Sequence, residues 1–576
     1  MELALFGVVG VLTIVAAGVF GQKLGVATPL ILIVIGVAFS YLPGAPSEVP
    51  NEIILTVLLP PILYSAAVQV PVVDFRRNIS SISALSVLLV LVTAFVTGFL
   101  LYLIFPDLSL AAGIAIGAVI SPTDAVAATA LGKRLGLPPR LVTILEGEGL
   151  VNDATALVLL RSAVAAIATT VTFWSVIGDF AFAVAVALVL GVVIGFITVK
   201  LRSKLHDPVL DTAISFAVPF IAFIPAEYVG ASGVLAVVVA GLYSGHSSAK
   251  HFSAQARISE RLNWRTVQFV LENGVFLIMG LEISALIVDV ETADLSASYA
   301  VSIGLLMVVT VVAVRFIFVV PLIVYLRRQA AEAERKQTRF RAMLDRLRGR
   351  VDLPEKFVRR QERAELVYSR RQSDLELLRA EGLGWRGGLV LGWSGMRGVV
   401  TLAAAQSLPK ELDYHSQLVL IAFTVAVVTL LLQGGTLPWL IRITGIRGSD
   451  RTADNRALAE LLDEMGEAGL SVLEQPQLEL PDGETISPVA MERVRNDTML
   501  AAEAAWERAD QGAGPGSLAQ SPQRQYRQLR QEVLQAERLA LLDARSSGTY
   551  PSRILGRAQA MLDLEETRLQ QIDNPG

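Results

Sequence analysis

The chain has 576 residues, of which 53% are hydrophobic and only 18% are charged, and its formal net charge is -4. About a quarter of the residues in a soluble globular protein are charged, so this composition excludes a string of ordinary soluble domains and indicates a membrane protein. The sequence contains no cysteine, which excludes disulfides, thiolate catalysis and thiolate-bound metals.

Apolar runs of about twenty residues recur along the first three quarters of the chain, and each is long enough for a transmembrane helix. Runs of this length exclude membrane-spanning strands, so the sequence predicts an all-α polytopic membrane protein. We predict thirteen spans, near residues 3–21, 27–43, 50–69, 84–105, 110–131, 141–168, 174–199, 209–226, 231–245, 266–288, 299–326, 387–407 and 416–441.

The charges of the loops indicate how these spans are oriented. With the amino terminus outside, every odd-numbered loop is cytoplasmic, and these loops hold almost all of the loop lysines and arginines. The even-numbered loops are acidic, with Lys410 as their only clear base. The first apolar run lacks the flanks of a signal peptide, so we expect it to be retained as a helix. We predict a plasma-membrane protein with a cytoplasmic carboxy-terminal tail.

Two polar stretches accompany the transmembrane domain at residues 1–443. Residues 327–386 are dense in Arg and Glu at helical spacings and predict a cytoplasmic helical insertion, broken at Gly349 and Pro354. This insertion is either a solvated helical hairpin or a sensor of anionic lipid headgroups. Residues 444–576 predict a helical cytoplasmic tail with a regulatory or oligomerising role. The tail carries no nucleotide-binding or nucleic-acid-binding motif, so we expect no nucleic-acid partner.

The fifth span contains Ser121-Pro122-Thr123-Asp124. Proline inside a helix removes a backbone donor and clashes with the preceding turn, so we expect the span to break here. The freed carbonyls and the two hydroxyls are hard oxygen ligands that suit an alkali cation, with Asp124 adding charge. The alternative is a simple proline kink that Asp124 caps. Irregular backbone at membrane depth is tolerated mainly where it is buried or lines a cavity, which favours the cation site.

The sixth span contains the run Glu146-Gly147-Glu148-Gly149-Leu150-Val151-Asn152-Asp153. Glu148 and Asn152 are four residues apart and share a helix face, with Asp153 one position round. Asp153 lies midway along the span, where a carboxylate is costly and normally functional. As a mere packing residue, Asp153 would need a basic partner, for which Arg161 and Arg397 are the candidates.

Arg397 belongs to the twelfth span, within Gly392-Trp393-Ser394-Gly395-Met396-Arg397-Gly398. This Gly-rich run predicts a second interrupted helix. Paired interruptions in two halves of a transporter indicate a binding site at the interface of two repeats. Spans 4–6 and 11–13 enter the membrane from opposite sides, which is compatible with an inverted repeat. Arg397 is also a candidate partner for Glu148, and that pairing would leave Asp153 free to exchange ligands.

Together, the three motifs of the fifth, sixth and twelfth spans resemble the sodium/proton exchanger (NhaP-type) branch of the monovalent cation:proton antiporters. The resemblance covers residues 1–443 apart from the insertion. It implies a homodimer in which spans 1–3 and 8–10 form an interface part and spans 4–6 and 11–13 form a moving core part. It also implies a secondary transporter, not an enzyme, that needs no cofactor.

The resemblance further implies roles for individual residues. Asp153 would be the site of the transported cation and the proton, with Asn152 beside it and Thr123 contributing to the cation site. Thr123 and Asp124 would belong to the unwound crossing, and Glu148 with Arg397 would form a structural ion pair. Two departures from the family pattern bear on ion preference. Ser65 stands where an acid often follows the Pro-Pro of the third span, and Gly149 stands where Ser is frequent.

One carboxylate that holds either a proton or a sodium ion couples the two fluxes by competition. If Asp153 alone exchanges, the loaded site is neutral with either ligand and transport is electroneutral. Potassium/proton exchange is the alternative, and a gated cation channel is a remote one.

Three further polar residues lie within the predicted spans. Glu272 and Glu282 in the tenth span either line a path or bond between helices, and Arg315 in the eleventh either neutralises a core acid or extends toward the cytoplasm.

Overall fold

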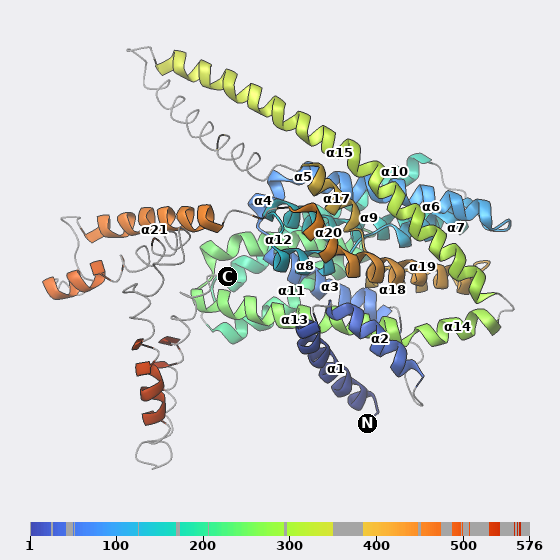
Figure 1. Ribbon diagram of the computed structural model, residues 1–576, viewed down its shortest axis with the longest axis horizontal. Helices are drawn as coiled ribbons and strands as arrows, with labels where there is room; N and C mark the ends of the chain where they lie inside the picture. The colour runs from blue at the N-terminus through green and yellow to red at the C-terminus, as the bar shows by residue number, and fades with distance from the viewer. Residues whose placement is uncertain are drawn as a thin grey trace. The chain divides into compact units, whose positions relative to one another are not determined.

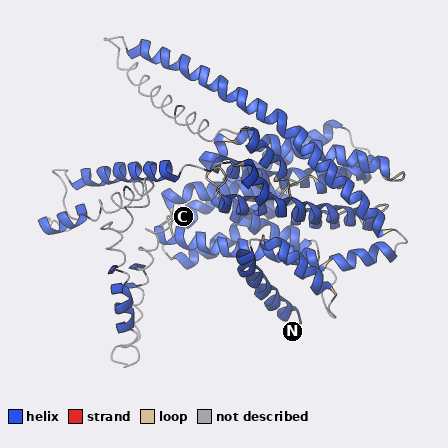
Figure 2. Ribbon diagram, viewed as in Figure 1, coloured by secondary structure: helices blue, strands red, loops and turns tan. Residues whose placement is uncertain are grey.

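The computed structural model describes the greater part of the transmembrane region and parts of the tail. The described residues are 2–24, 27–41, 50, 52–124, 126–168, 173–205, 207–292, 296–348, 372, 384–446, 448, 451–473, 487–496, 498, 506, 529–530, 532–541, 558, 561–562 and 564–565. Within these residues the chain forms helices and connecting turns without strands (Figure 2). The predicted all-α fold is confirmed.

The chain divides into two compact units, residues 1–448 and 449–576. The helices of the first unit are drawn in Figure 1. In its first half they are α1 (Glu2–Leu24), α2 (Thr28–Ser40), the π-helical η1 (Ile53–Leu58), α3 (Leu59–Gln69), α4 (Val72–Arg77), α5 (Ile79–Ser83), the π-helical η2 (Ala84–Leu89), α6 (Val90–Ile104), α7 (Leu110–Ile120), α8 (Val126–Leu135), α9 (Pro139–Ala168) and α10 (Phe173–Arg202). In its second half they are α11 (Pro208–Tyr228), α12 (Gly233–His251), α13 (Ala254–Leu281), α14 (Ile283–Thr292), α15 (Ala297–Arg348), α17 (Trp385–Trp393), α18 (Val399–Gln406), α19 (His415–Thr429), the π-helical η3 (Leu430–Gly434) and α20 (Gly435–Thr444).

Every one of the thirteen predicted spans contains a described helix. Among the described residues, 7 helical segments are long and apolar enough to cross a bilayer by themselves, and shorter apolar helices accompany them. The two predicted interruptions are also present. The fifth span breaks between α7 and α8 at Ser121–Asp124, and the twelfth breaks between α17 and α18 at Ser394–Gly398.

The insertion begins differently from its prediction. We expected the eleventh span to end near residue 326, but α15 runs without a break from Ala297 to Arg348 as a single helix of 52 residues (Figure 1). Residues 327–348 have no helix-breaking glycine or proline, so the membrane helix continues into the polar sequence. The predicted breaks at Gly349 and Pro354 lie outside the described residues.

The first described helix of the tail unit is α21 (Arg451–Leu473). The described residues 488–496 and 532–541 of the tail are also helical.

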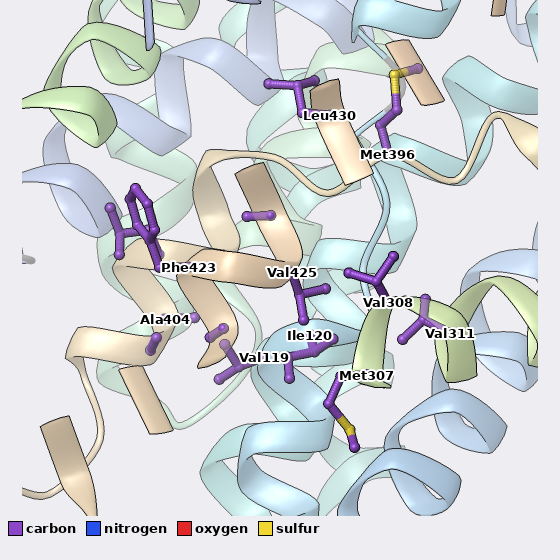
Figure 3. Close-up of a cluster of buried hydrophobic side chains, with 14 of the residues drawn as sticks. Val119, Ile120, Met307, Val308, Val311, Met396, Ala404, Phe423, Val425 and Leu430 are labelled. Carbon is purple, nitrogen blue, oxygen red and sulfur yellow. The ribbon is translucent and has the colours of Figure 1, made fainter. Parts of the chain in front are cut away.

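The core of the first unit packs around the half-helix α7. Figure 3 shows Val119 and Ile120 of α7 among Met307 of α15, Phe423 of α19 and other buried apolar side chains. On its other side α7 meets α6 at two glycines. A β-carbon at Gly98 would lie 2.7 Å from the carbonyl oxygen of Gly113, so only glycine permits this approach. The end of α7, where the fifth span breaks, is therefore held firmly from several directions.

Candidate ion-binding site

The two interrupted spans meet at their non-helical segments. The Asp124 backbone N–H donates a hydrogen bond of 2.7 Å to the carbonyl oxygen of Met396. A β-carbon at Gly398 would lie 2.5 Å from the Asp124 carboxylate, so a larger residue at position 398 would push the two segments apart. Proline and glycine thus serve different purposes at the crossing: Pro122 ends one helix, and Gly398 lets the other segment approach it.

Charged side chains lie at the helix ends next to the two breaks. Arg397 Nε donates to the carbonyl oxygen of Ile120, the last residue of α7, at 3.0 Å. Arg315 Nε donates to the carbonyl oxygen of Leu391 in the last turn of α17, also at 3.0 Å. Each arginine therefore satisfies a carbonyl at the negative end of a helix dipole. Asp124 precedes α8 and lies against Gly398, the residue before α18, so its negative charge is close to two helix amino termini.

Glu148 is the acid most fully neutralised at the site. Arg315 Nη1 donates to its Oε1 at 2.5 Å, and Arg315 Nη2 donates to its Oε2 at 2.9 Å. Both side chains are 2% exposed, so this is a buried bidentate ion pair. The predicted pairing of Glu148 with Arg397 is wrong as a direct contact. The Arg397 guanidinium instead donates to the backbone carbonyls of Ile120 and Gly395.

Thr123 joins the crossing to the sixth span. Its hydroxyl donates to Glu148 Oε1 at 2.6 Å and accepts from Asn152 Nδ2 at 3.0 Å. The same Asn152 nitrogen donates to the Thr123 carbonyl oxygen at 2.7 Å. Glu148 and Asn152 thus share a helix face, as their spacing predicts, and that face is fixed to the unwound segment. Ser121, the other predicted hydroxyl ligand, donates to the Ala118 carbonyl oxygen at 2.9 Å.

Asp153 differs from these residues because the described part of the chain gives its side chain neither a hydrogen bond nor an ion pair. The two basic partners that a packing role would require are engaged elsewhere. Arg161 bonds to Glu227 of α11, and Arg397 bonds to backbone. Asp153 is half-buried near the middle of α9, and the negative charge of Asp124 acts on it.

The charges of the site can now be compared. Three carboxylates, those of Asp124, Glu148 and Asp153, accompany the two guanidiniums of Arg315 and Arg397. One negative charge is therefore in excess, and Asp153 is the carboxylate for which the described residues supply no bonded partner. A site of this kind can hold one monovalent cation or one proton and become neutral with either.

Breaking the buried pair is expected to destabilise the protein. Removing one member leaves an uncompensated buried charge, so Arg315→Ala and Glu148→Ala should each lower the free energy of unfolding by about 3–5 kcal/mol. The double variant should recover part of that loss, because neither charge is then left alone. Thermal unfolding of the purified protein in detergent measures both effects.

The ion pair of Arg161 with Glu227 offers a matched control, because Arg161 is 54% exposed. Arg161→Ala should cost about 1 kcal/mol or less. Purely additive losses for the Arg315 and Glu148 variants would contradict the pairing.

Comparison with known proteins agrees with this architecture. Residues 9–443 match the family model described as "Sodium/hydrogen exchanger, transmembrane". An uncharacterised Na(+)/H(+) exchanger of Mycobacterium tuberculosis is 27% identical over 98% of this chain and 96% of its own length. The Na(+)/H(+) antiporter ApNhaP of Aphanothece halophytica is 26% identical over 75% of this chain and 72% of its own length. A sodium, potassium, lithium and rubidium/H(+) antiporter of Bacillus subtilis is 30% identical over 51% of this chain and 45% of its own length.

The fold is also similar to a solved structure. The sodium proton antiporter MjNhaP1 from Methanocaldococcus jannaschii superposes with a TM-score of 0.55 at 16% identity, over 77% of this chain and all of that one. The matched family model extends over most of the chain and includes every residue of the crossing and of α9. The chain belongs to the sodium/hydrogen exchanger family, whose members are secondary transporters and not enzymes.

Proposed function

We propose that this protein exchanges sodium for protons across the plasma membrane by competition at Asp153. The observation that carries the proposal is that the described residues give the Asp153 carboxylate no bonded partner, whereas Arg315 neutralises Glu148. Cation and proton occupy the same carboxylate in turn, which couples their movements in opposite directions. Spans 4–6 and 11–13 would carry the site past spans 1–3 and 8–10, within a homodimer whose amino termini are outside.

The cation would find a second oxygen ligand close to Asp153. Asn152 is fully buried and both of its hydrogen bonds use the amide nitrogen. Within the described part of the chain, its Oδ1 has no hydrogen-bond partner. An amide oxygen is a hard ligand that suits an alkali cation, as are hydroxyls and carboxylates. The hydroxyls of Ser121 and Thr123 are bonded within the protein, so they would join the cation only by exchanging those bonds. Asp124 would contribute charge.

Potassium/proton exchange is the second candidate, and one relative favours it. The Bacillus subtilis protein named above is described as an antiporter of sodium, potassium, lithium and rubidium. Ser65 offers no carboxylate on α3, and its hydroxyl donates to the Ile62 carbonyl oxygen at 2.7 Å. A site with fewer charged ligands discriminates less among alkali cations by field strength. Proton flux in proteoliposomes, recorded while sodium, potassium and lithium are varied, decides between the two candidates.

Asp153→Asn should abolish cation/proton exchange while leaving a folded, membrane-inserted protein, because the amide is isosteric but cannot release a proton. The measurement is sodium-driven proton flux in proteoliposomes. Glu146→Gln is the matched control: Glu146 lies on the same helix and forms its ion pair with Lys133 at 2.7 Å, away from the crossing. Near-normal exchange by purified Asp153→Asn would refute the proposal.

Exchange should be electroneutral, because one proton replaces one monovalent cation at a single carboxylate. A transported net charge would be driven by roughly 2.3 kcal/mol per 100 mV of membrane potential. We therefore expect the rate of sodium-driven proton flux to be unaffected by a potassium–valinomycin potential. A rate that follows the potential would mean that a second charge travels with the site.

Low pH should weaken apparent sodium affinity. Below the pKa of the exchanging carboxyl, protons fill the site, so the apparent KM for sodium should rise about tenfold per pH unit when both sides are acidified together. The maximal rate should change much less, because saturating sodium displaces the proton. Initial rates across a matrix of sodium concentration and pH measure this, and a fall in maximal rate at constant KM would exclude simple competition.

A further inference from the structure

A hydrogen bond connects the tenth span with the twelfth. Gln406 Nε2, on the last residue of α18, donates to Glu282 Oε2 at 2.8 Å, and Glu282 directly follows the last residue of α13. Glu282 is buried and Gln406 is half-buried. Of the two roles that the sequence leaves open for Glu282, bonding between helices is therefore the one that is observed.

The same two helices also share an apolar contact. Val275 of α13 and Ala403 of α18 pack together with Ile54 of η1. Val275 lies two turns before Glu282, and Ala403 lies one turn before the glutamine that bonds it, so the apolar contact and the hydrogen bond follow one helix–helix interface. Apolar side chains can slide past each other without losing a directional bond, whereas the hydrogen bond fixes one relative position of the two helices.

An ion pair connects the sixth span with the eighth in a similar way. Arg161, two turns beyond Asp153 on α9, bonds to Glu227 Oε2 in the last turn of α11. Glu227 Oε1 accepts a hydrogen bond of 2.9 Å from the backbone N–H of Gly233 at the start of α12, so this carboxylate is fixed to the turn between α11 and α12. Because the Arg161 side chain is exposed, the pair is weak and opens at little cost.

Both bonds lie on the same side of the membrane. Helices α9, α11, α13 and α18 belong to the predicted spans 6, 8, 10 and 12, which cross the membrane in one direction. The four bonded residues lie in the carboxy-terminal part of these helices or directly after it. With the amino terminus outside, that side is extracellular. Each bond also joins the proposed core part, which holds spans 6 and 12, to the proposed interface part, which holds spans 8 and 10.

We propose that the Glu282–Gln406 and Arg161–Glu227 bonds form an outer latch, which must open before Asp153 can exchange ions with the extracellular side. The inference rests on the proposed exchange at Asp153 and on the proposed division and orientation of the transmembrane domain. When the core part moves against the interface part, a bond between the two parts cannot keep its length, so both bonds break. The released polar groups lie near the extracellular ends of their helices and can bond to water instead, which makes the opening reversible.

Cross-linking tests whether the latch has to open. The chain contains no cysteine, so two introduced cysteines are its only thiols. In a double variant with Glu282→Cys and Gln406→Cys, a short bifunctional methanethiosulfonate reagent bridges the two thiols. Sodium-driven proton flux in proteoliposomes should be lost in proportion to the bridged fraction, and dithiothreitol should restore it. A double variant with Arg161→Cys and Glu227→Cys should respond in the same way.

The matched control is a double variant with Gln69→Cys and Gln268→Cys. Gln69 Nε2 of α3 donates to Gln268 Oε1 of α13 at 2.7 Å, so these side chains are as close as those of the latch, but both helices belong to the interface part. Bridging the control pair should leave the flux unchanged. Undiminished flux through protein with a fully bridged Glu282–Gln406 pair would overturn the proposal, and so would an equal loss in the control.

A second measurement needs no cross-link. Arg161→Ala combined with Gln406→Ala removes one partner from each bond and so favours the conformation that faces outward. The apparent KM for sodium at the outer face, measured in right-side-out vesicles, should fall about fivefold, because a larger fraction of the protein then presents its site to that side. An unchanged or higher outer KM would contradict the latch. Failure of either test leaves exchange at Asp153 intact, whereas activity in Asp153→Asn would refute the proposed function itself.

Discussion

The structure depends on satisfying unwound backbone at membrane depth. Breaking two helices inside the bilayer exposes carbonyls and N–H groups that lipid cannot bond, at a cost of several kcal/mol for each unsatisfied group. The protein meets this requirement by crossing the two breaks. One backbone bond joins Asp124 to Met396, and Arg397 and Arg315 each satisfy the carboxy-terminal end of one half-helix. The candidate site residues are positioned by the same bonds that make the crossing tolerable.

Arg315 has a special position in this arrangement because it serves two purposes. Its Nε bonds the Leu391 carbonyl, while its two terminal nitrogens hold Glu148. Glu148 in turn accepts a hydrogen bond from the Thr123 hydroxyl. The same hydroxyl accepts a hydrogen bond from Asn152 Nδ2 and so holds the Asn152 side chain in place. A continuous set of bonds therefore extends from α15 and α17 through the crossing to α9. Asp153, one residue beyond Asn152, is held in place by its helix, while no described residue bonds to its carboxylate.

Much of this arrangement was predictable from the sequence. Pro122 and the Gly-rich run around Arg397 predict both breaks, and the four-residue spacing of Glu148 and Asn152 predicts their common face. The sequence could not predict that Arg315 is the arginine that pairs with Glu148. The two residues are 167 positions apart, and only the rotation of α15 about its axis decides which acid Arg315 meets. Its depth in an apolar span was the available signal. Likewise, hydropathy predicts where the apolar part of the eleventh span ends, but it does not predict where helix α15 ends. Polar residues continue an α-helix as readily as apolar ones.

The uninterrupted α15 has a mechanical consequence. From Arg315 to Arg348 it extends for 33 residues, about 50 Å at 1.5 Å per residue. A stiff rod of that length works as a lever: a tilt of about 5° at Arg315 would displace the far end by about 4 Å. A sub-ångström adjustment around the Glu148 ion pair would thereby be magnified at Arg348, far along the chain from that pair.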